Sequence, residues 1–296
     1  MTAHLSGRVI VLHYPAVLPC IYNSIDSYST AFFLDAAHAV SVIVEEGNPA
    51  RSMLSSNISP RKTLVFIWSL APWVFLALGL HQFRSIFWSF LLYHGFCLLP
   101  AILYNRGHWQ KHMHIPTRKD LLVLVFASIG FSAFTFITYS LLSDLLLDRA
   151  LALESMHERG FKMSWYLPLS LYFLTVNPIL EELFWRGVVL NELCDEGQPV
   201  FSLPGIWTNV AFAVWHFLVI RLFVAPVFIP LAIGFVLAVG FFMSWMYRRK
   251  DTLILPALWH SIVFDLAVII ILTMVLFGPI SAEAAPTIVP LLERLR

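Results

Sequence analysis

The sequence predicts an all-α fold, a polytopic transmembrane helical bundle of about seven spans. Of its 296 residues, 59% are hydrophobic and 12% are charged, and the mean hydropathy is +0.77. This composition is typical of a multi-pass membrane protein and argues against an ordinary soluble domain. From residue 63 onward the chain consists of apolar segments long enough to cross the ~30 Å hydrocarbon core of a bilayer as helices. The protein is therefore expected to be embedded in the lipid bilayer.

Seven apolar segments define the expected spans. The first two are joined tightly around Arg84. Each segment is close to the length of about 20 residues that a membrane-crossing helix needs. The expected spans run over residues 63–83, 85–104, 121–147, 165–190, 201–220, 225–247 and 253–277.

These spans divide the chain into four regions. Residues 1–60, where prolines and charges interrupt the apolar runs, are expected to form an N-terminal extension that lies on the membrane. Residues 61–160 hold the N-terminal transmembrane helices, and residues 161–277 form a helical core that carries most of the polar residues. Residues 278–296 are expected to form a short C-terminal tail.

Net charge and cysteine content exclude several other classes. A net charge of +1 gives no reason to expect a nucleic-acid partner. The three cysteines, Cys20, Cys97 and Cys194, are too few and too scattered for a disulfide framework or a thiolate metal site. They are expected to be inert.

The distribution of lysine and arginine predicts the orientation in the membrane. Basic residues collect in the loops 105–120 and 248–251, and Arg61 and Lys62 precede the first span. With seven spans all three groups fall on one side, which the positive-inside rule assigns to the cytoplasm.

The stretch 177–187 places Glu181, Glu182 and Arg186 inside an apolar segment. A charge near the centre of a bilayer costs ~2.5–3.5 kcal/mol on insertion scales, so such residues usually pair or line a functional cavity. Glu182 and Arg186 are four residues apart and can pair on one helical face. Glu181 points elsewhere without a local cation, as a general base requires. The alternative is a charged pair that anchors a helix end at the membrane surface.

Two later spans add His216 and His260, and Asp265 follows in the last span. A glutamate and two histidines from three helices could hold zinc or activate water without a metal. The metal-free mechanism is favoured because the paired-histidine motif of zinc proteases is missing and Glu182 is engaged by Arg186. His94, in the second span, is expected to be an interhelical hydrogen-bonding residue outside the site.

Three motifs occur in a recognisable order: Glu-Glu-x-x-x-Arg at 181–186, Phe-x-x-x-His at 212–216, and Leu-Pro-Ala-Leu-Trp-His at 255–260. Together they resemble the CPBP family of CAAX-processing and bacteriocin-processing intramembrane endopeptidases, over about residues 165–270. The resemblance implies that 161–277 is the catalytic core of a glutamic peptidase that needs no cofactor. It also implies a bacterial inner membrane and a substrate that is a membrane-associated or C-terminally tagged protein or peptide.

The resemblance also assigns roles to individual residues. Glu181 and His216 would activate the attacking water, and His260 would stabilise the oxyanion. The supporting residues would be Glu182, Arg186, Phe212 and Asp265.

The last motif departs from the family pattern, which places a polar residue four positions after the histidine. That position is Phe264 here, and the carboxylate comes one residue later, at Asp265. In a regular α-helix five residues correspond to about 140° of rotation, which turns Asp265 away from His260. Either the helix bulges locally, or Asp265 has another role, such as pairing with a neighbouring helix, which is the favoured interpretation.

Three other functions remain open from the sequence. The chain could be a non-catalytic immunity or regulatory protein that keeps the family fold, and the displaced Asp265 favours this alternative. It could be a zinc-dependent membrane protease. A transporter with a proton relay is the weakest alternative, because the polar residues show no symmetry between two halves of the chain.

Overall fold

The computed structural model describes residues 59–280 and 284–296. The predicted extension 1–60 therefore lies outside the described residues, except for its last two positions. The described residues form helices and no β-strand, which confirms the all-α prediction.

Six helices are long and apolar enough to cross a membrane, by length and composition, among the described residues. They correspond to six of the seven expected spans. The remaining segment, 165–190, forms a continuous helix from α10 (Tyr166–Glu182) and η5 (Leu183–Leu190). This segment carries the charged residues of the predicted site. The six are Pro60–Gln82, Ile86–Tyr104, Arg118–Ser143, Leu203–Ile220, Pro226–Lys250 and Ile254–Phe277.

Most spans combine α-helix with a short π-helix or a break. The π-helices are η1 (Leu78–Gln82), η2 (Leu91–Leu98), η5 and η7 (His260–Asp265). The α-helical parts are α3 (Pro60–Trp68), α4 (Ala71–Ala77), α5 (Ile86–Phe90), α6 (Leu99–Tyr104), α8 (Arg118–Leu146), α10, α12 (Leu203–Val214), α13 (Phe217–Ile220), α14 (Ile229–Lys250), α15 (Ile254–Trp259) and α16 (Leu266–Phe277).

The remaining elements connect these spans. Helices α7 (Arg106–Trp109) and η3 (Gln110–His112) precede α8, and α9 (Arg149–Glu158) and η4 (Met163–Trp165) precede α10. The other connecting or terminal elements are α11 (Asn191–Leu193), η6 (Pro226–Phe228) and α17 (Ala285–Leu295).

Capping residues explain where the first helices begin. Ser59 and Ser85 are extended residues whose side chains accept hydrogen bonds from the backbone N–H groups of the first turns of α3 and α5. Thr117 and Asp120 form a capping box at the start of α8, each side chain bonding the other residue's backbone N–H. The tight turn expected at Arg84 is present, and this residue has a φ of 45°.

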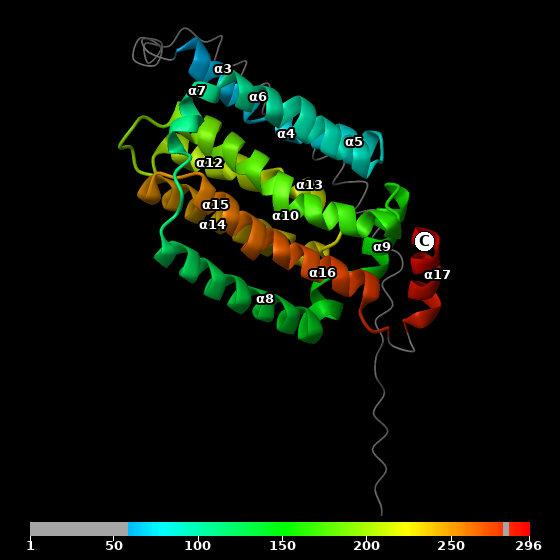
Figure 1. Cartoon of the computed structure of the whole chain (residues 1–296). Coiled ribbons are helices and arrows are strands. Elements are labelled where there is room, and N and C mark those ends of the chain that lie inside the picture. Colours follow the sequence, from blue (N-terminus) through cyan, green and yellow to red (C-terminus); the bar gives the residue numbers. More distant parts are fainter. Residues whose placement is uncertain (1–58, 281–283) are drawn as a thin grey trace, which may run out of the picture. The chain divides into compact units, whose positions relative to one another are not determined.

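Helix α10 lies inside the bundle, beside elements from both halves of the chain (Figure 1). It contacts η2 of the second span and η7 and α16 of the last span, while α8 covers α16 and η7 from the other side. Helix α12 packs along α14. This arrangement surrounds the charged end of α10 with protein rather than lipid.

The predicted short tail contains α17, which packs against α9. Close to it, the Arg149 guanidinium donates hydrogen bonds to the carbonyl oxygens of Val275, Gly278 and Pro279 at 2.8, 3.1 and 2.9 Å. A cation at this position satisfies carbonyl groups left free at the C-terminal end of α16.

The basic segments predicted to be cytoplasmic converge on one end of the bundle. Arg61 binds the side chain of Asn105 at 2.7 Å, just before the loop 105–120. In that loop, His112 contacts Asp251 at 2.6 Å. The two basic loops and the start of the first span therefore lie on the same side.

We expect Gln110→Cys and Asp251→Cys to be labelled from the cytoplasmic side only, because both positions are exposed and follow the positive-inside rule. Glu158→Cys, exposed beyond the far end of α8, should be labelled from the opposite side. The measurement uses a membrane-impermeant thiol reagent on intact cells and on inverted vesicles, in a background without native cysteines. Labelling of Gln110→Cys and Asp251→Cys from different sides would contradict the arrangement.

Candidate active site

The predicted pair of Glu182 and Arg186 forms inside the bundle. Arg186 Nη1 donates to Glu182 Oε1 at 2.8 Å, and neither side chain is more than 1% exposed. The guanidinium also donates to the carbonyl oxygen of Gly240 on α14 at 2.9 Å. It lies over the ring of Phe212, 4.6 Å from the ring centroid, within the range of a cation–π contact. Arg186 thereby ties η5 to α12 and α14.

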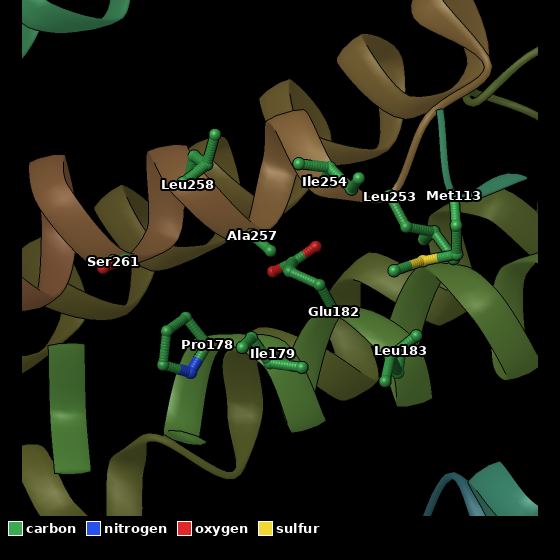
Figure 2. A pocket seen from close by; sticks show the side chains of 10 residues that line it. All are labelled: Met113, Pro178, Ile179, Glu182, Leu183, Leu253, Ile254, Ala257, Leu258 and Ser261. Atoms are coloured by element: carbon green, nitrogen blue, oxygen red, sulfur yellow. The ribbon is translucent and has the colours of Figure 1, made fainter. Parts of the chain in front are cut away.

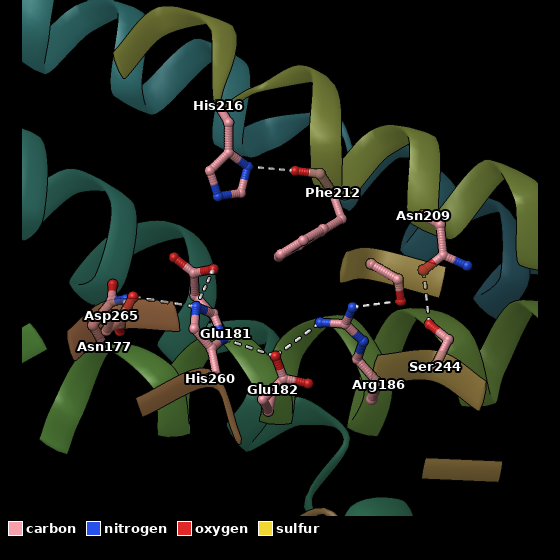
Figure 3. A network of polar contacts seen from close by, with 11 residues as sticks. Asn177, Glu181, Glu182, Arg186, Asn209, Phe212, His216, Ser244, His260 and Asp265 are labelled. Carbon is pink, nitrogen blue, oxygen red and sulfur yellow. Dashed lines mark hydrogen bonds and ion pairs between the residues drawn. The ribbon is translucent and has the colours of Figure 1, made fainter. Parts of the chain in front are cut away.

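Glu182 also fixes His260. The same oxygen, Oε1, accepts a hydrogen bond from His260 Nδ1 at 2.9 Å (Figure 3). This bond sets the orientation of the imidazole and directs Nε2 to the other side of the ring. There Nε2 lies 4.0 Å from Glu181 Oε2 and 3.6 Å from Asp265 Oδ1. All three acidic residues of the predicted site thus lie around one histidine.

A proline in α10 provides a further link to His260's helix. Pro178 has no N–H, so the carbonyl group of Leu174, four residues earlier, loses its helical partner. The hydroxyl of Ser261 donates to that carbonyl oxygen at 2.5 Å. The carbonyl group that Pro178 leaves without a helical partner is therefore hydrogen-bonded by Ser261, the residue next to His260. This bond links the two helices at the site.

The bulge that would align Asp265 with His260 is present. Residues His260–Asp265 form a π-helix, and the N–H of Leu266 bonds the carbonyl oxygen of Ser261 instead of that of Ile262. The hydroxyl of Ser128 on α8 donates to the freed Ile262 carbonyl oxygen at 2.5 Å. The inserted residue places a side chain five positions later on nearly the same helical face. Asp265 consequently faces His260.

Asn177, to which the sequence patterns gave no role, completes the polar network together with His94. Asn177 donates from Nδ2 to Asp265 Oδ2 at 3.1 Å, and its Oδ1 contacts His94 Nε2 at 3.0 Å. His94 thus has the interhelical bond that was expected of it. Asn177 lies four residues before Glu181 on α10, and its polar side chain at that spacing could have indicated its role.

His216 approaches the site from the end of α12. Its Nδ1 donates to the carbonyl oxygen of Phe212 at 2.8 Å, which leaves Nε2 of a neutral ring able to accept a proton. Its ring stacks on Trp215 with centroids 3.7 Å apart. In Figure 3 the imidazole points toward the carboxylate of Glu181. The side chains assigned by resemblance therefore lie around one region.

An apolar pocket of about 190 Å³ opens beside this network, between α10 and α15. Figure 2 shows the Glu182 carboxylate among its lining side chains. Glu182 Oε2 is buried and has no hydrogen-bond partner among the described residues. The pocket is lined by Met113, Pro178, Ile179, Glu182, Leu183, Leu253, Ile254, Ala257, Leu258 and Ser261.

The charged side chains do not form a metal-ligand set in the part of the chain that the structure describes. Within residues 59–280 and 284–296, no three His, Cys, Asp or Glu side chains are placed to hold a metal ion. The geometry instead joins one guanidinium, one imidazole and three carboxyl groups through direct contacts.

Comparison with known proteins shows a family similarity in this region. A search of curated proteins and a search of solved structures gave no match. A family model described as type II CAAX prenyl endopeptidase Rce1-like matches residues 163–267, which contain α10, η5, α12, α14, α15 and η7. The matched segment covers all three sequence motifs and confirms the resemblance to the CPBP family. Residues 163–267 of this multi-pass membrane protein are therefore similar to the type II CAAX prenyl endopeptidases of the Rce1-like family.

Proposed function

We propose that this protein is an intramembrane endopeptidase in which Glu181 activates a water molecule for attack on a peptide bond. The observation that carries the proposal is the unequal environment of the two adjacent glutamates. Glu182 is held by Arg186 and His260, whereas Glu181 Oε2 is buried and has no hydrogen-bond partner among the described residues. A carboxylate oxygen without a protein donor can accept a proton from water.

The proposed reaction begins when Glu181 removes a proton from water as the water oxygen bonds to the scissile carbonyl carbon. His216 Nε2 is available to accept a hydrogen bond from the same water. The oxyanion that forms would accept a hydrogen bond from the Nε2–H of protonated His260, whose Nδ1 is anchored on Glu182. Glu181 then returns the proton to the leaving nitrogen as the C–N bond breaks.

The substrate that suits this site is a protein or peptide held at the membrane. The pocket beside Glu182 is apolar and would accept an apolar side chain or another apolar group close to the scissile bond. The likeness to prenyl endopeptidases favours a C-terminal protein tail as the substrate. We place the protein in the bacterial inner membrane, as the sequence resemblance implies.

The main alternative, a non-catalytic immunity or regulatory protein of the same fold, is less well supported. Its best argument was that Asp265 is displaced from the family position. The π-helix that turns Asp265 toward His260 weakens that argument. A zinc-dependent protease is also less well supported, because Glu182 already has Arg186 and His260 as partners.

We expect Glu181→Ala to abolish peptidase activity and Glu182→Gln to leave part of it. Only Glu181 would accept the proton of the water, whereas glutamine at 182 keeps one oxygen for Arg186 and His260. The measurement is cleavage of a farnesylated CAAX peptide by purified variants with equal folded fractions.

The matched control for these variants is Glu154→Gln, an exposed glutamate on α9, which should cleave at the wild-type rate. Equal loss in the Glu181 and Glu182 variants would refute the division of roles. Full activity of Glu181→Ala would refute the proposed enzyme.

We expect cleavage to persist in a chelator, because the proposed water is activated by a carboxylate rather than by a metal ion. The rate is measured after dialysis against a strong chelator and again after addition of Zn²⁺. Loss of activity that zinc restores would overturn the metal-free mechanism in favour of the zinc alternative.

Substitution of Asp265 tests whether the π-helix brings this residue into the site. Asp265→Asn should retain most activity, because the amide oxygen can still accept from Asn177. Asp265→Ala should lower turnover per folded molecule by about 10-fold or more, since His260 loses a neighbour 3.6 Å away. Unchanged turnover with a lower folded yield would make Asp265 a structural residue.

A further inference from the structure

Asn177 is a buried residue of α10 that the proposed mechanism does not use. Its side chain lies between two others: Nδ2 donates to Asp265 Oδ2 at 3.1 Å, and Oδ1 lies 3.0 Å from His94 Nε2. Asn177 is 5% exposed and His94 is 4% exposed, so both contacts are shielded from bulk water. The bridge connects η2 of the second span to η7 of the last span through α10.

The carboxylate at one end of the bridge fixes the direction of both hydrogen bonds. A carboxylate only accepts, so the amide nitrogen of Asn177 has to face Asp265 and the amide oxygen has to face His94. His94 Nε2 is then the donor of the second bond, and its ring carries a proton on Nε2. Without this donor the amide could turn round and present its oxygen to Asp265. His94 therefore determines which end of the amide Asp265 meets.

The other oxygen of Asp265 stops short of His260. The distance from Oδ1 to His260 Nε2 is 3.6 Å. A charge-assisted N–H···O hydrogen bond is about 2.7–2.9 Å long, and a contact of 3.6 Å is not a hydrogen bond. Glu181 Oε2 is farther away still, at 4.0 Å. Neither of these two carboxyl groups therefore takes the N–H of Nε2.

That N–H is the group that the proposed reaction directs to the oxyanion. A donor acts on the transition state only if it is free and aimed at the position where negative charge develops. If Asp265 moved about 1 Å closer, it would form a charge-assisted hydrogen bond, which is roughly twice as strong as one between neutral groups. The N–H of His260 would then be occupied before the substrate arrives.

We propose that Asn177, oriented by His94, is a positioning residue that holds Asp265 away from His260 Nε2 and so keeps this N–H free for the oxyanion. This inference rests on the proposed function. His94 lies outside the segment 163–267 that matches the family model, whereas the other three residues lie within it. The second span thus acts on the site through Asn177 and not through contact with the substrate.

The first test is Asn177→Leu, which keeps a side chain of similar size and removes the amide. We expect kcat per folded molecule for a farnesylated CAAX peptide to fall about 10- to 100-fold with KM nearly unchanged, because Asp265 is released to bind His260. Asn209→Leu is the matched control. Asn209 is also buried, but its amide accepts from Ser244 at 2.8 Å and joins α12 to α14. This variant should keep the wild-type kcat.

A second substitution separates positioning from packing. In Asn177→Leu/Asp265→Asn the group that would capture His260 is neutral and binds the N–H less strongly. We therefore expect kcat to return to within about 3-fold of that of Asp265→Asn alone, a non-additive result that a packing defect would not give. The same fold-loss from Asn177→Leu in both backgrounds, or wild-type kcat in Asn177→Leu, would overturn the proposal.

The role of His94 is tested with two variants. His94→Phe keeps a ring beside Phe90 and Tyr172 but lacks the donor, whereas His94→Gln keeps an N–H donor. We expect kcat to fall about 3- to 10-fold in His94→Phe and less in His94→Gln, with no further loss when His94→Phe is added to Asn177→Leu. Equal kcat in the two His94 variants would overturn the role of His94.

The same assay distinguishes failure of this inference from failure of the proposed function. An inactive wild type or an active Glu181→Ala would overturn both, since the proposed oxyanion would not form. An inactive Glu181→Ala together with wild-type kcat in Asn177→Leu would refute only the positioning role of Asn177.

Discussion

The site depends on a single carboxylate oxygen, Glu182 Oε1, which accepts from both Arg186 and His260 at 2.8 and 2.9 Å. Through these partners it joins the end of α10 to η7, and Arg186 continues the connection to Gly240 on α14. Buried charges are tolerated when they are paired, and removing one partner of such a pair typically costs about 3–5 kcal/mol. The network therefore links helix packing to the position of His260, so the fold and the proposed chemistry cannot vary independently.

Irregular backbone near the site is stabilised by hydroxyl groups from neighbouring helices. Ser261 binds the carbonyl group freed by Pro178, and Ser128 binds the carbonyl group freed by the π-helix His260–Asp265. In a bilayer, water cannot satisfy such groups, so a protein partner is needed wherever a helix departs from regular geometry. Ser128 lies on α8, far from the motifs in sequence. This contact gives the N-terminal half of the chain a part in shaping the site.

Local sequence spacing predicted what local geometry controls. The all-α class followed from composition and apolar length, and the Glu182–Arg186 pair followed from a separation of four residues on one helix. Asp265 could not be placed in this way, because its direction depends on the π-helix His260–Asp265. One residue inserted into a helix rotates every later side chain about the helix axis, and no residue type signals the insertion. Asn177 shares a helical face with Glu181, but its partners His94 and Asp265 lie on other helices, and spacing along one helix does not identify them. The C-terminal residues were expected to form only a short tail. They contain helix α17, which packs against α9, and such a contact between separate segments cannot be read from local spacing.

The arrangement of charges explains why two adjacent glutamates can differ in role. Three carboxyl groups, those of Glu181, Glu182 and Asp265, lie near one guanidinium and one imidazole. Even with His260 protonated, one carboxyl group has no counter-charge. Glu182 is held by two donors and Asp265 by the amide of Asn177, whereas no donor in the described chain holds Glu181 Oε2. Glu181 is therefore the carboxyl group with the fewest protein partners, and it faces His216 (Figure 3). In the proposed reaction it is the group that takes a proton from water and returns it to the leaving nitrogen.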